Sequence, residues 1–265
     1  MRADYHIHTN FSVDSKLTME EIIIRSIELG LDEICFTDHV DYGVKNQYVD
    51  KQEVDYPEFI KEYNRLNEKY KERIVIRLGL EFGVQLETMN LYREDMQKYD
   101  FDFILLSCHQ IDNKELWLNQ YQSTKTQLEY NRGYYEYLYK LIDEYDEFSV
   151  VGHLDVIKRY DQNGALDDSH IMDLVERILI RLIEKNKGLE VNTSSYRYNL
   201  PDLTPSTLIL NRYYELGGRL LTMGSDTHKI ENLKDHFEEI IVQLKEIGFT
   251  ELYRFDKMNP FPYTI

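Results

Sequence analysis

Seven short apolar runs recur along this chain, and segments with a helical hydrophobic pattern separate them. The runs cover residues 4–8, 33–36, 74–80, 101–107, 148–152, 189–192 and 219–223. Alternation of this kind predicts parallel strands joined by helical crossovers. Seven units in 265 residues predict an α/β fold, a distorted seven-stranded parallel β/α barrel (TIM-like) that forms a single domain over residues 1–265. A doubly wound open sheet is the alternative fold.

Local signals mark the helical segments between these runs. Thr18 begins a capping-box pattern, and Pro57 suits the first turn of a helix that follows a polar loop ending near Tyr56. Asp168 is in the position of a cap for a later helix. We expect a short final strand over residues 252–255, followed by a tail that wraps the surface.

Six of the seven runs end at, or just before, a side chain that binds metal ions. In a parallel barrel the carboxyl ends of all strands lie on one face, where active sites form. His6 and His8 are two residues apart in one strand and should therefore point to the same side. His170 and His236 fall on predicted helices and are assigned no ligand role. The strand-end set comprises His6, His8, His39, Glu81, His109, His153, Asp226 and His228.

This mixture of imidazole and carboxylate groups indicates the kind of ion. It favours zinc, manganese or iron, whereas magnesium and calcium sites are built mostly from oxygen. A lone histidine at a strand end is more commonly a hydrogen-bonded pocket residue, but repetition at corresponding positions favours a metal site. The set exceeds the needs of one tetrahedral ion. We therefore expect two or three divalent transition-metal ions, with Glu81 able to bridge two of them.

The charge of the chain restricts its partners. There are 31 Lys and Arg against 48 Asp and Glu, a net charge of −17, which opposes binding to a nucleic-acid backbone. A small phosphorylated substrate is still compatible, because bound cations and a few arginines can reverse the local sign. The two cysteines predict no disulfide framework, and neither a leader segment nor a membrane-spanning run is found. We expect a soluble cytoplasmic protein without a nucleic-acid or membrane partner, and its oligomeric state is left open.

The strand-end motifs together resemble the PHP (polymerase and histidinol phosphatase) superfamily. Their order and spacing over nearly the whole chain resemble its histidinol-phosphate phosphatase branch. The resemblance implies a distorted seven-stranded β/α barrel with a trinuclear metal centre. The motifs are Asp4-x-His6-x-His8-Thr9, Thr37-Asp38-His39, Gly79-x-Glu81, His109, Gly152-His153-x-Asp155 and Gly224-Ser225-Asp226-x-His228.

The resemblance also implies one set of ligands for each ion. Some family members have a histidine where this chain has Asp14, and a plain surface aspartate is the alternative interpretation of that position. The three sets are, in order, His6, His8, Glu81 and Asp226; Glu81, His109 and His153; and Asp14, His39 and His228.

The implied activity is that of a histidinol-phosphate phosphatase. Such an enzyme hydrolyses L-histidinol phosphate to L-histidinol and phosphate, in histidine biosynthesis, by attack of a metal-activated hydroxide. Asp226 or His228 could assist proton transfer to the leaving alkoxide. Arg159 and Arg197, in the loops after the fifth and sixth runs, could hold the phosphate with their planar forks, the alternative being solvated surface arginines.

Other interpretations of the same residues remain open. Asp41 or Glu115 could pair with the substrate ammonium, although a surface position is the simpler interpretation of either one. The alternative activity is that of another phosphoesterase of the superfamily, acting on a nucleotide, an oligonucleotide or phosphotyrosine. A third class is a metal-binding regulatory module without catalysis.

Overall fold

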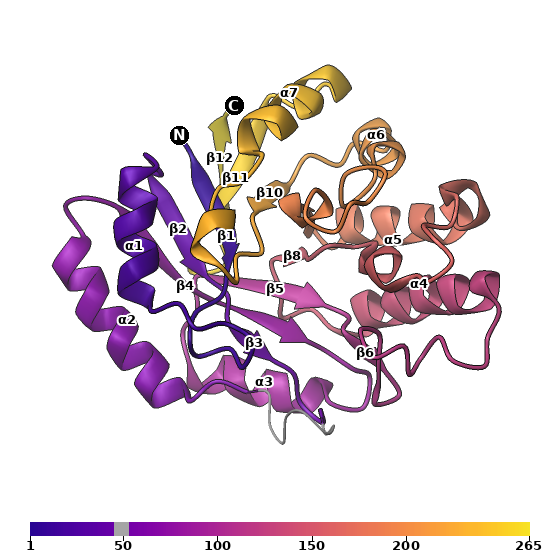
Figure 1. The fold of residues 1–265 in the computed structure, drawn as a ribbon, viewed down its shortest axis with the longest axis horizontal. Helices are drawn as coiled ribbons and strands as arrows, with labels where there is room; N and C mark the ends of the chain where they lie inside the picture. Colours follow the sequence, from indigo (N-terminus) through magenta and orange to yellow (C-terminus); the bar gives the residue numbers. More distant parts are fainter. Residues whose placement is uncertain (45–52) are drawn as a thin grey trace.

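Seven parallel strands form a curved sheet that follows the order of the chain (Figure 1). In the computed structural model, which describes residues 1–44 and 53–265, these strands are β1 (Ala3–Ile7), β2 (Glu33–Phe36), β4 (Val75–Gly83), β5 (Phe103–Ser107), β8 (Val150–Val151), β9 (Gly188–Asn192) and β10 (Leu221–Gly224). A bridge between Ile7 and Thr227, just after β10, brings the first and last strands together. The sheet is thus a nearly closed barrel. The predicted barrel is confirmed, and the open doubly wound sheet is wrong.

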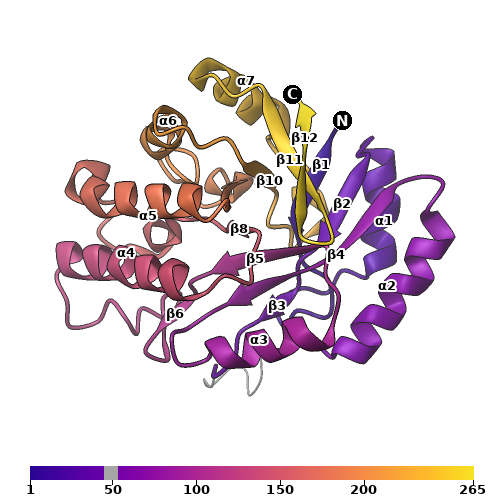
Figure 2. The same cartoon turned by 180° about the vertical axis from the view of Figure 1, so that it is seen from behind.

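Helices surround the outer side of this barrel (Figure 2). The predicted capping box at Thr18 is present, with Glu21 as its partner, and Pro57 lies in the first turn of its helix. The helices are α1 (Met19–Glu28), α2 (Tyr56–Tyr70), α3 (Met89–Lys98), α4 (Gln127–Glu144), α5 (Met172–Glu184), α6 (Thr207–Glu215) and α7 (Phe237–Ile247). Among the described residues, no helix combines the length and the apolar character needed to cross a membrane.

Some elements differ from the sequence-based expectations. The expected final strand is present as β11 (Glu251–Asp256), but the exposed tail after it forms a further strand, β12 (Asn259–Thr264), which pairs with β11 as an antiparallel hairpin. Asp168 does not cap α5 but lies in a 3-10 turn and forms an ion pair with Lys158. Three two-residue strands were not expected, namely β3 (His39–Val40), which pairs with β4, and the hairpin of β6 (Gln110–Ile111) and β7 (Lys114–Glu115). The polar loop before α2 lies partly outside the described residues.

Alternation along the strands decides which side chains face the barrel interior. In β9, Leu189 and Val191 pack in the large core cluster beneath the helices, while Glu190 faces inward toward His6. Aromatic side chains pack together at the amino-terminal end of the interior. There, the ring of Phe103 lies 5.0 Å from that of Tyr5 and 5.1 Å from that of Phe255, which comes from β11. This layer leaves the carboxyl end of the barrel for polar side chains.

An irregularity in β1 connects the two layers. The register between β1 and β2 shifts between Asp4 and Ile7. Such irregularities re-aim side chains relative to a regular strand. As a result, Tyr5 packs in the apolar layer and its neighbour His6 also faces inward, toward Glu190. His8 follows His6 on the same side, since the two imidazole rings lie 4.9 Å apart.

Candidate metal centre

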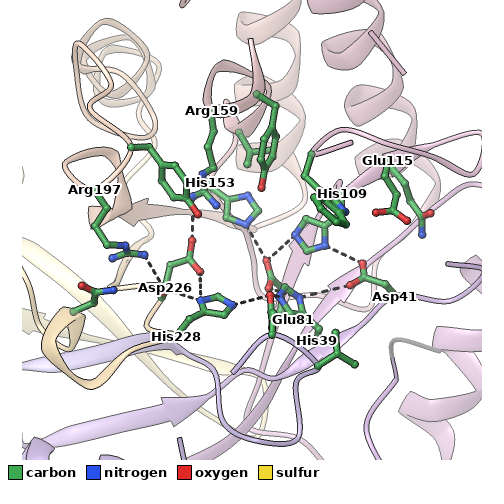
Figure 3. A pocket seen from close by; sticks show the side chains of 18 of the residues that line it. His39, Asp41, Glu81, His109, Glu115, His153, Arg159, Arg197, Asp226 and His228 are labelled. Carbon is green, nitrogen blue, oxygen red and sulfur yellow. Dashed lines mark hydrogen bonds and ion pairs between the residues drawn. The ribbon is translucent and has the colours of Figure 1, made fainter. Parts of the chain in front are cut away.

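A cavity of about 940 Å³ opens at the carboxyl ends of the strands (Figure 3). His6 and His8 lie fully buried beneath its floor. Every other residue of the predicted site contributes to the wall. These are Asp14, His39, Asp41, Glu81, His109, Glu115, His153, Arg159, Arg197, Asp226 and His228.

The buried carboxylate of Glu81 lies at the centre of the cluster. The strand β4 is longer than expected, so Glu81 lies inside it rather than at its end. Its Oε1 accepts a hydrogen bond from Ser107 Oγ at 2.6 Å. The same oxygen is 3.1 Å from His109 Nε2 and 2.9 Å from His153 Nε2. Glu81 therefore meets both histidines of the predicted second set.

The other oxygen of Glu81 faces the first set. Glu81 Oε2 lies 3.3 Å from His6 Nε2 and 3.5 Å from His8 Nε2. Asp226 Oδ1 is 3.7 Å and 3.6 Å from the same two nitrogens. His39 Nδ1 also approaches Glu81 Oε2, at 2.9 Å. One carboxylate thus contacts histidines from all three predicted sets.

Asp14 lies at the mouth of the cavity. Its Oδ2 is 3.1 Å from His228 Nε2 and 3.5 Å from His39 Nε2, and its side chain is 47% exposed. The His228 ring stacks on that of His8, with centroids 4.1 Å apart. The three members of the predicted third set are therefore adjacent. Their role as ligands stays a prediction.

Several ring nitrogens in this cluster are buried without a hydrogen bond, although carboxylate oxygens lie nearby. Buried polar atoms are nearly always hydrogen-bonded, so unsatisfied atoms that converge on one point fit the ligands of a cation. Within the described part of the chain, five groups of three histidines and carboxylates place their ligand atoms within 4.8 Å of one another. The chemistry of these donors fits zinc, manganese or iron. The unsatisfied atoms that face the cluster are His6 Nε2, His8 Nε2, His39 Nδ1, Glu81 Oε2 and His228 Nε2.

The electrostatics of the cluster follow from its burial and its mixed charges. Burial opposes a charge on His6, but the carboxylates of Glu190 and Glu81 raise its pKa well above the usual value. Burial likewise disfavours the imidazolium of His109, yet Asp41 and Glu81 raise its pKa to about 9. Burial by itself raises the pKa of Glu81, but the surrounding histidines hold that pKa well below its usual value. Glu81 and the imidazoles of His6 and His109 therefore favour each other's charged forms.

Both predicted arginines lie beside Asp226. Arg159 Nη2 donates to Asp226 Oδ2 at 3.0 Å and to Ser194 Oγ at 2.6 Å. Arg197 donates from Nη1 to the carbonyl of Ser225 and from Nη2 to that of Asp226, each at 2.8 Å. These bonds hold both guanidinium groups at the wall of the cavity.

The two candidate carboxylates for an ammonium group differ in their surroundings. Asp41 is buried, and its Oδ1 lies 2.8 Å from His109 Nδ1. Gly83 makes this approach feasible, because a Cβ at that position would lie 1.4 Å from Asp41 Oδ1. Glu115, on β7, is also buried and lines the cavity near Trp117. A contact of either carboxylate with substrate stays a prediction.

Two carboxylates that hold the site could not be recognised as functional from the sequence. Glu190 Oε1 lies 2.6 Å from His6 Nδ1. The signal available in the sequence was a charged residue inside an apolar run. The second carboxylate is that of Asp38, in the motif Thr37-Asp38-His39. Its carboxylate accepts hydrogen bonds from the backbone N–H groups of Thr9 and Ser12, and so positions the loop after β1.

These features define an α/β-barrel protein whose buried histidines and carboxylates form a cluster suited to divalent metal ions. Residues 4–194, most of the chain, match the model of the PHP domain. The protein therefore belongs to the PHP domain family.

Named relatives resemble the chain over nearly its whole length. It is 31% identical to the histidinol-phosphatase of Lactococcus lactis subsp. lactis (strain IL1403), over 97% of this chain and 96% of that protein. A probable histidinol-phosphatase of Thermotoga maritima is 29% identical over 94% of both chains. Among solved structures, histidinol phosphate phosphatase from Lactococcus lactis subsp. lactis Il1403, complexed with zinc, L-histidinol and phosphate, superposes with a TM-score of 0.91, 28% identity and 98% coverage of both chains.

Proposed function

We propose that this protein is a histidinol-phosphate phosphatase, which hydrolyses L-histidinol phosphate to L-histidinol and phosphate in histidine biosynthesis. The observation that carries the proposal is the ring of histidines around Glu81, in a cavity whose wall includes Arg159 and Arg197. Histidinol-phosphatase relatives that match over nearly the whole chain support the same substrate. We extend the phosphoesterase domain over residues 1–265, because Asp226 and His228 lie beyond the part that matches the family model.

We propose two or three divalent ions for this site, held by the three predicted ligand sets. Zinc is the first choice, since a related structure contains it, and manganese and iron suit the same donors. Such ions supply positive charge to the phosphate oxygens and activate a water molecule as the nucleophile. The protein contributes the fixed positions of the donors, with Glu81 shared between the first two sets.

Residues of the chain are proposed to orient the phosphate and to move the proton. Arg159 and Arg197 would bind phosphate oxygens from the side of Asp226. Burial raises the pKa of Asp226, but His6 and Arg159 hold it well below the usual value. An ionised Asp226 must first accept a proton from the attacking water before it can pass one to the alkoxide. His228, whose Nδ1 lies 3.4 Å from Asp226 Oδ1, is the other proposed member of this relay.

The ammonium group of the substrate needs a carboxylate partner. Asp41 lies against His109, inside the histidine cluster where the cations are proposed to bind. Glu115 lies on the wall of the cavity rather than within the histidine cluster. We propose that Glu115 pairs with the ammonium, and that Asp41 contributes by orienting His109.

We also propose a cytoplasmic location and no nucleic-acid or membrane partner. The two cysteines, Cys35 and Cys108, are free and buried, which is typical of proteins in reducing compartments. The net charge of −17 disfavours anionic polymers and anionic lipid surfaces.

A comparison of substrates tests the proposed activity. Phosphate release would be measured with histidinol phosphate, mononucleotides and phosphotyrosine on the same metal-loaded preparation. We expect the highest kcat/KM on histidinol phosphate, and a higher value on a nucleotide or on phosphotyrosine would favour the alternative phosphoesterase activity.

The variant Arg197→Ala tests the proposed phosphate site. It should lower kcat/KM while leaving the metal content intact, because Arg197 contacts backbone carbonyls and no predicted ligand side chain. Arg212→Ala is a matched control, since Arg212 pairs with Glu176 on the helical surface. An unaltered kcat/KM in Arg197→Ala would remove this residue from the phosphate site.

A further inference from the structure

Glu190 is a fully buried carboxylate that belongs to none of the three ligand sets. It lies on β9, with 1% of its surface exposed, and points into the barrel below the histidine cluster. Its Oε1 lies 2.6 Å from His6 Nδ1. Its Oε2 accepts the backbone N–H of His153 at 2.8 Å and a side-chain N–H of Asn192 at 3.1 Å. Each oxygen therefore has at least one protein partner.

The contact with His6 decides which ring nitrogen of that residue faces the cluster. A carboxylate only accepts hydrogen bonds, so the proton must be on His6 Nδ1. Asn192 Nδ2 lies 3.4 Å from the same nitrogen, and the much shorter contact to Glu190 dominates. In the neutral imidazole that binds a cation, the lone pair is then on His6 Nε2, which faces Glu81 Oε2 at 3.3 Å. This orientation is the one in which the imidazole binds a cation.

The second oxygen of Glu190 positions the backbone of a residue that follows another strand, β8. It holds the backbone at His153, whose Nε2 lies 2.9 Å from Glu81 Oε1. His6 belongs to the first predicted set and His153 to the second. One carboxylate therefore ties together members of two ligand sets that lie far apart in the sequence.

The sequence also makes room for this carboxylate. A Cβ at position 224 would lie 2.2 Å from Glu190 Oε1 and 2.4 Å from His6 Cβ. Only glycine fits at this point of β10, which accounts for Gly224 in the last motif. The close packing of Gly224, Glu190 and His6 indicates a built support rather than a chance contact.

We propose that Glu190 is a positioning residue, which sets the tautomer of His6 and the backbone position of His153 so that the site binds its metal ions tightly. Carboxylates that accept the second N–H of a metal-binding histidine typically change metal affinity about 10- to 100-fold when they are removed. The proposal rests on the metal centre of the proposed function but not on its substrate.

The variant Glu190→Gln tests this role. A glutamine amide cannot accept from His6 and from the His153 N–H at once, because one of its two polar ends is a donor. Zinc titrations of the metal-free protein in chelator-buffered solutions should show affinity about 10- to 100-fold weaker than in the unmodified protein. Unchanged affinity and metal content in a folded Glu190→Gln protein would overturn the proposal.

A matched control separates this effect from the general cost of altering a buried glutamate. Glu33 is equally buried, but it binds Tyr5 and Arg77 at the opposite end of the barrel. The variant Glu33→Gln should therefore keep the zinc affinity of the unmodified protein. Equal losses of zinc affinity in both variants would assign the effect to disturbed folding and reject a specific role of Glu190.

A measurement on the unmodified protein covers the case in which Glu190→Gln does not fold. Nitrogen-15 NMR of the zinc-loaded protein should show His6 with a proton on Nδ1 and none on Nε2, and the reverse tautomer would overturn the proposal. Neither measurement uses a phosphate ester. Zinc affinity could fall in Glu190→Gln while the unmodified protein fails to hydrolyse histidinol phosphate. That combination would refute the proposed function and leave the proposed role of Glu190 intact.

Discussion

Gly83 offers a sharp test of how the second ligand set is assembled. Its φ lies outside the left-handed region, so the backbone would accept alanine without strain. The added Cβ, however, would lie 1.4 Å from Asp41 Oδ1 and 2.9 Å from His109 Nδ1. We therefore predict that Gly83→Ala displaces the Asp41 carboxylate from His109.

The size of the effect follows from these distances. Contacts of a Cβ below 3.0 Å essentially do not occur, so Asp41 Oδ1 must retreat by 3.0 minus 1.4, or 1.6 Å. Its contact with His109 is now 2.8 Å, and hydrogen bonds of this kind reach only to about 3.2 Å. The contact should therefore be lost. Overpacking and the lost charged hydrogen bond together should destabilise the protein by about 2–5 kcal/mol.

The assay combines urea unfolding of the metal-free protein with metal analysis of the loaded protein. We expect a lower free energy of unfolding and a metal affinity reduced about tenfold or more, since His109 loses its orienting partner. A Gly83→Ala protein within about 0.5 kcal/mol of the unmodified stability, and with full metal content, would refute the reasoning.

A double variant isolates the steric cause. In an Asp41→Ala background the clashing carboxylate is absent, so adding Gly83→Ala should cost less stability than it does alone. Strictly additive losses would show that Asp41 and Gly83 act independently.

Two further predictions concern protonation and a buried ion pair. Neighbouring carboxylates raise the pKa of His109 to about 9, so the metal-free protein holds this imidazole protonated at neutral pH. Metal binding should therefore release protons at neutral pH, and the contribution of His109 should disappear as the pH rises through about 9. Calorimetry in buffers of different ionisation enthalpy measures this release, and no release at neutral pH would contradict the prediction. Lys158→Met should destabilise the fold by about 3–5 kcal/mol, because Lys158 Nζ lies 3.0 Å from Asp155 and 2.6 Å from Asp168, in a buried network. Urea unfolding measures this change, and a decrease in the free energy of unfolding of less than about 1 kcal/mol would show that these ion pairs are not needed for stability.

Much of the fold could be predicted because it depends on local patterns. The run at β2 was placed with its observed bounds, and the capping box of Thr18 and Glu21 is present as expected. Both depend on residues a few positions apart, which a sequence displays directly. Parallel strand order then follows from the alternation of strands and helices.

Elements that depend on distant contacts could not be predicted in the same way. The residues after Asp256 contain prolines and read as a surface tail, yet they pair with β11, and Phe255 closes the apolar end of the barrel. Asp168 resembled a helix cap, but its carboxylate is taken by Lys158. In each case a partner remote in sequence outweighed a local preference.

The sequence by itself determined the alternation of strands and helices and the metal-binding side chains near the strand ends. Each strand–helix unit repeats the same hydrophobic pattern, and all parallel strands end on the same face of the barrel. Only the tertiary structure decided which of those side chains meet. It placed Glu81 between the histidines, bonded Asp41 to His109, and brought Glu190 beneath His6. The physical reason is that hydrogen bonds act over about 3 Å, and only closure of the barrel brings His6 and Glu190, which are 184 positions apart, within that distance.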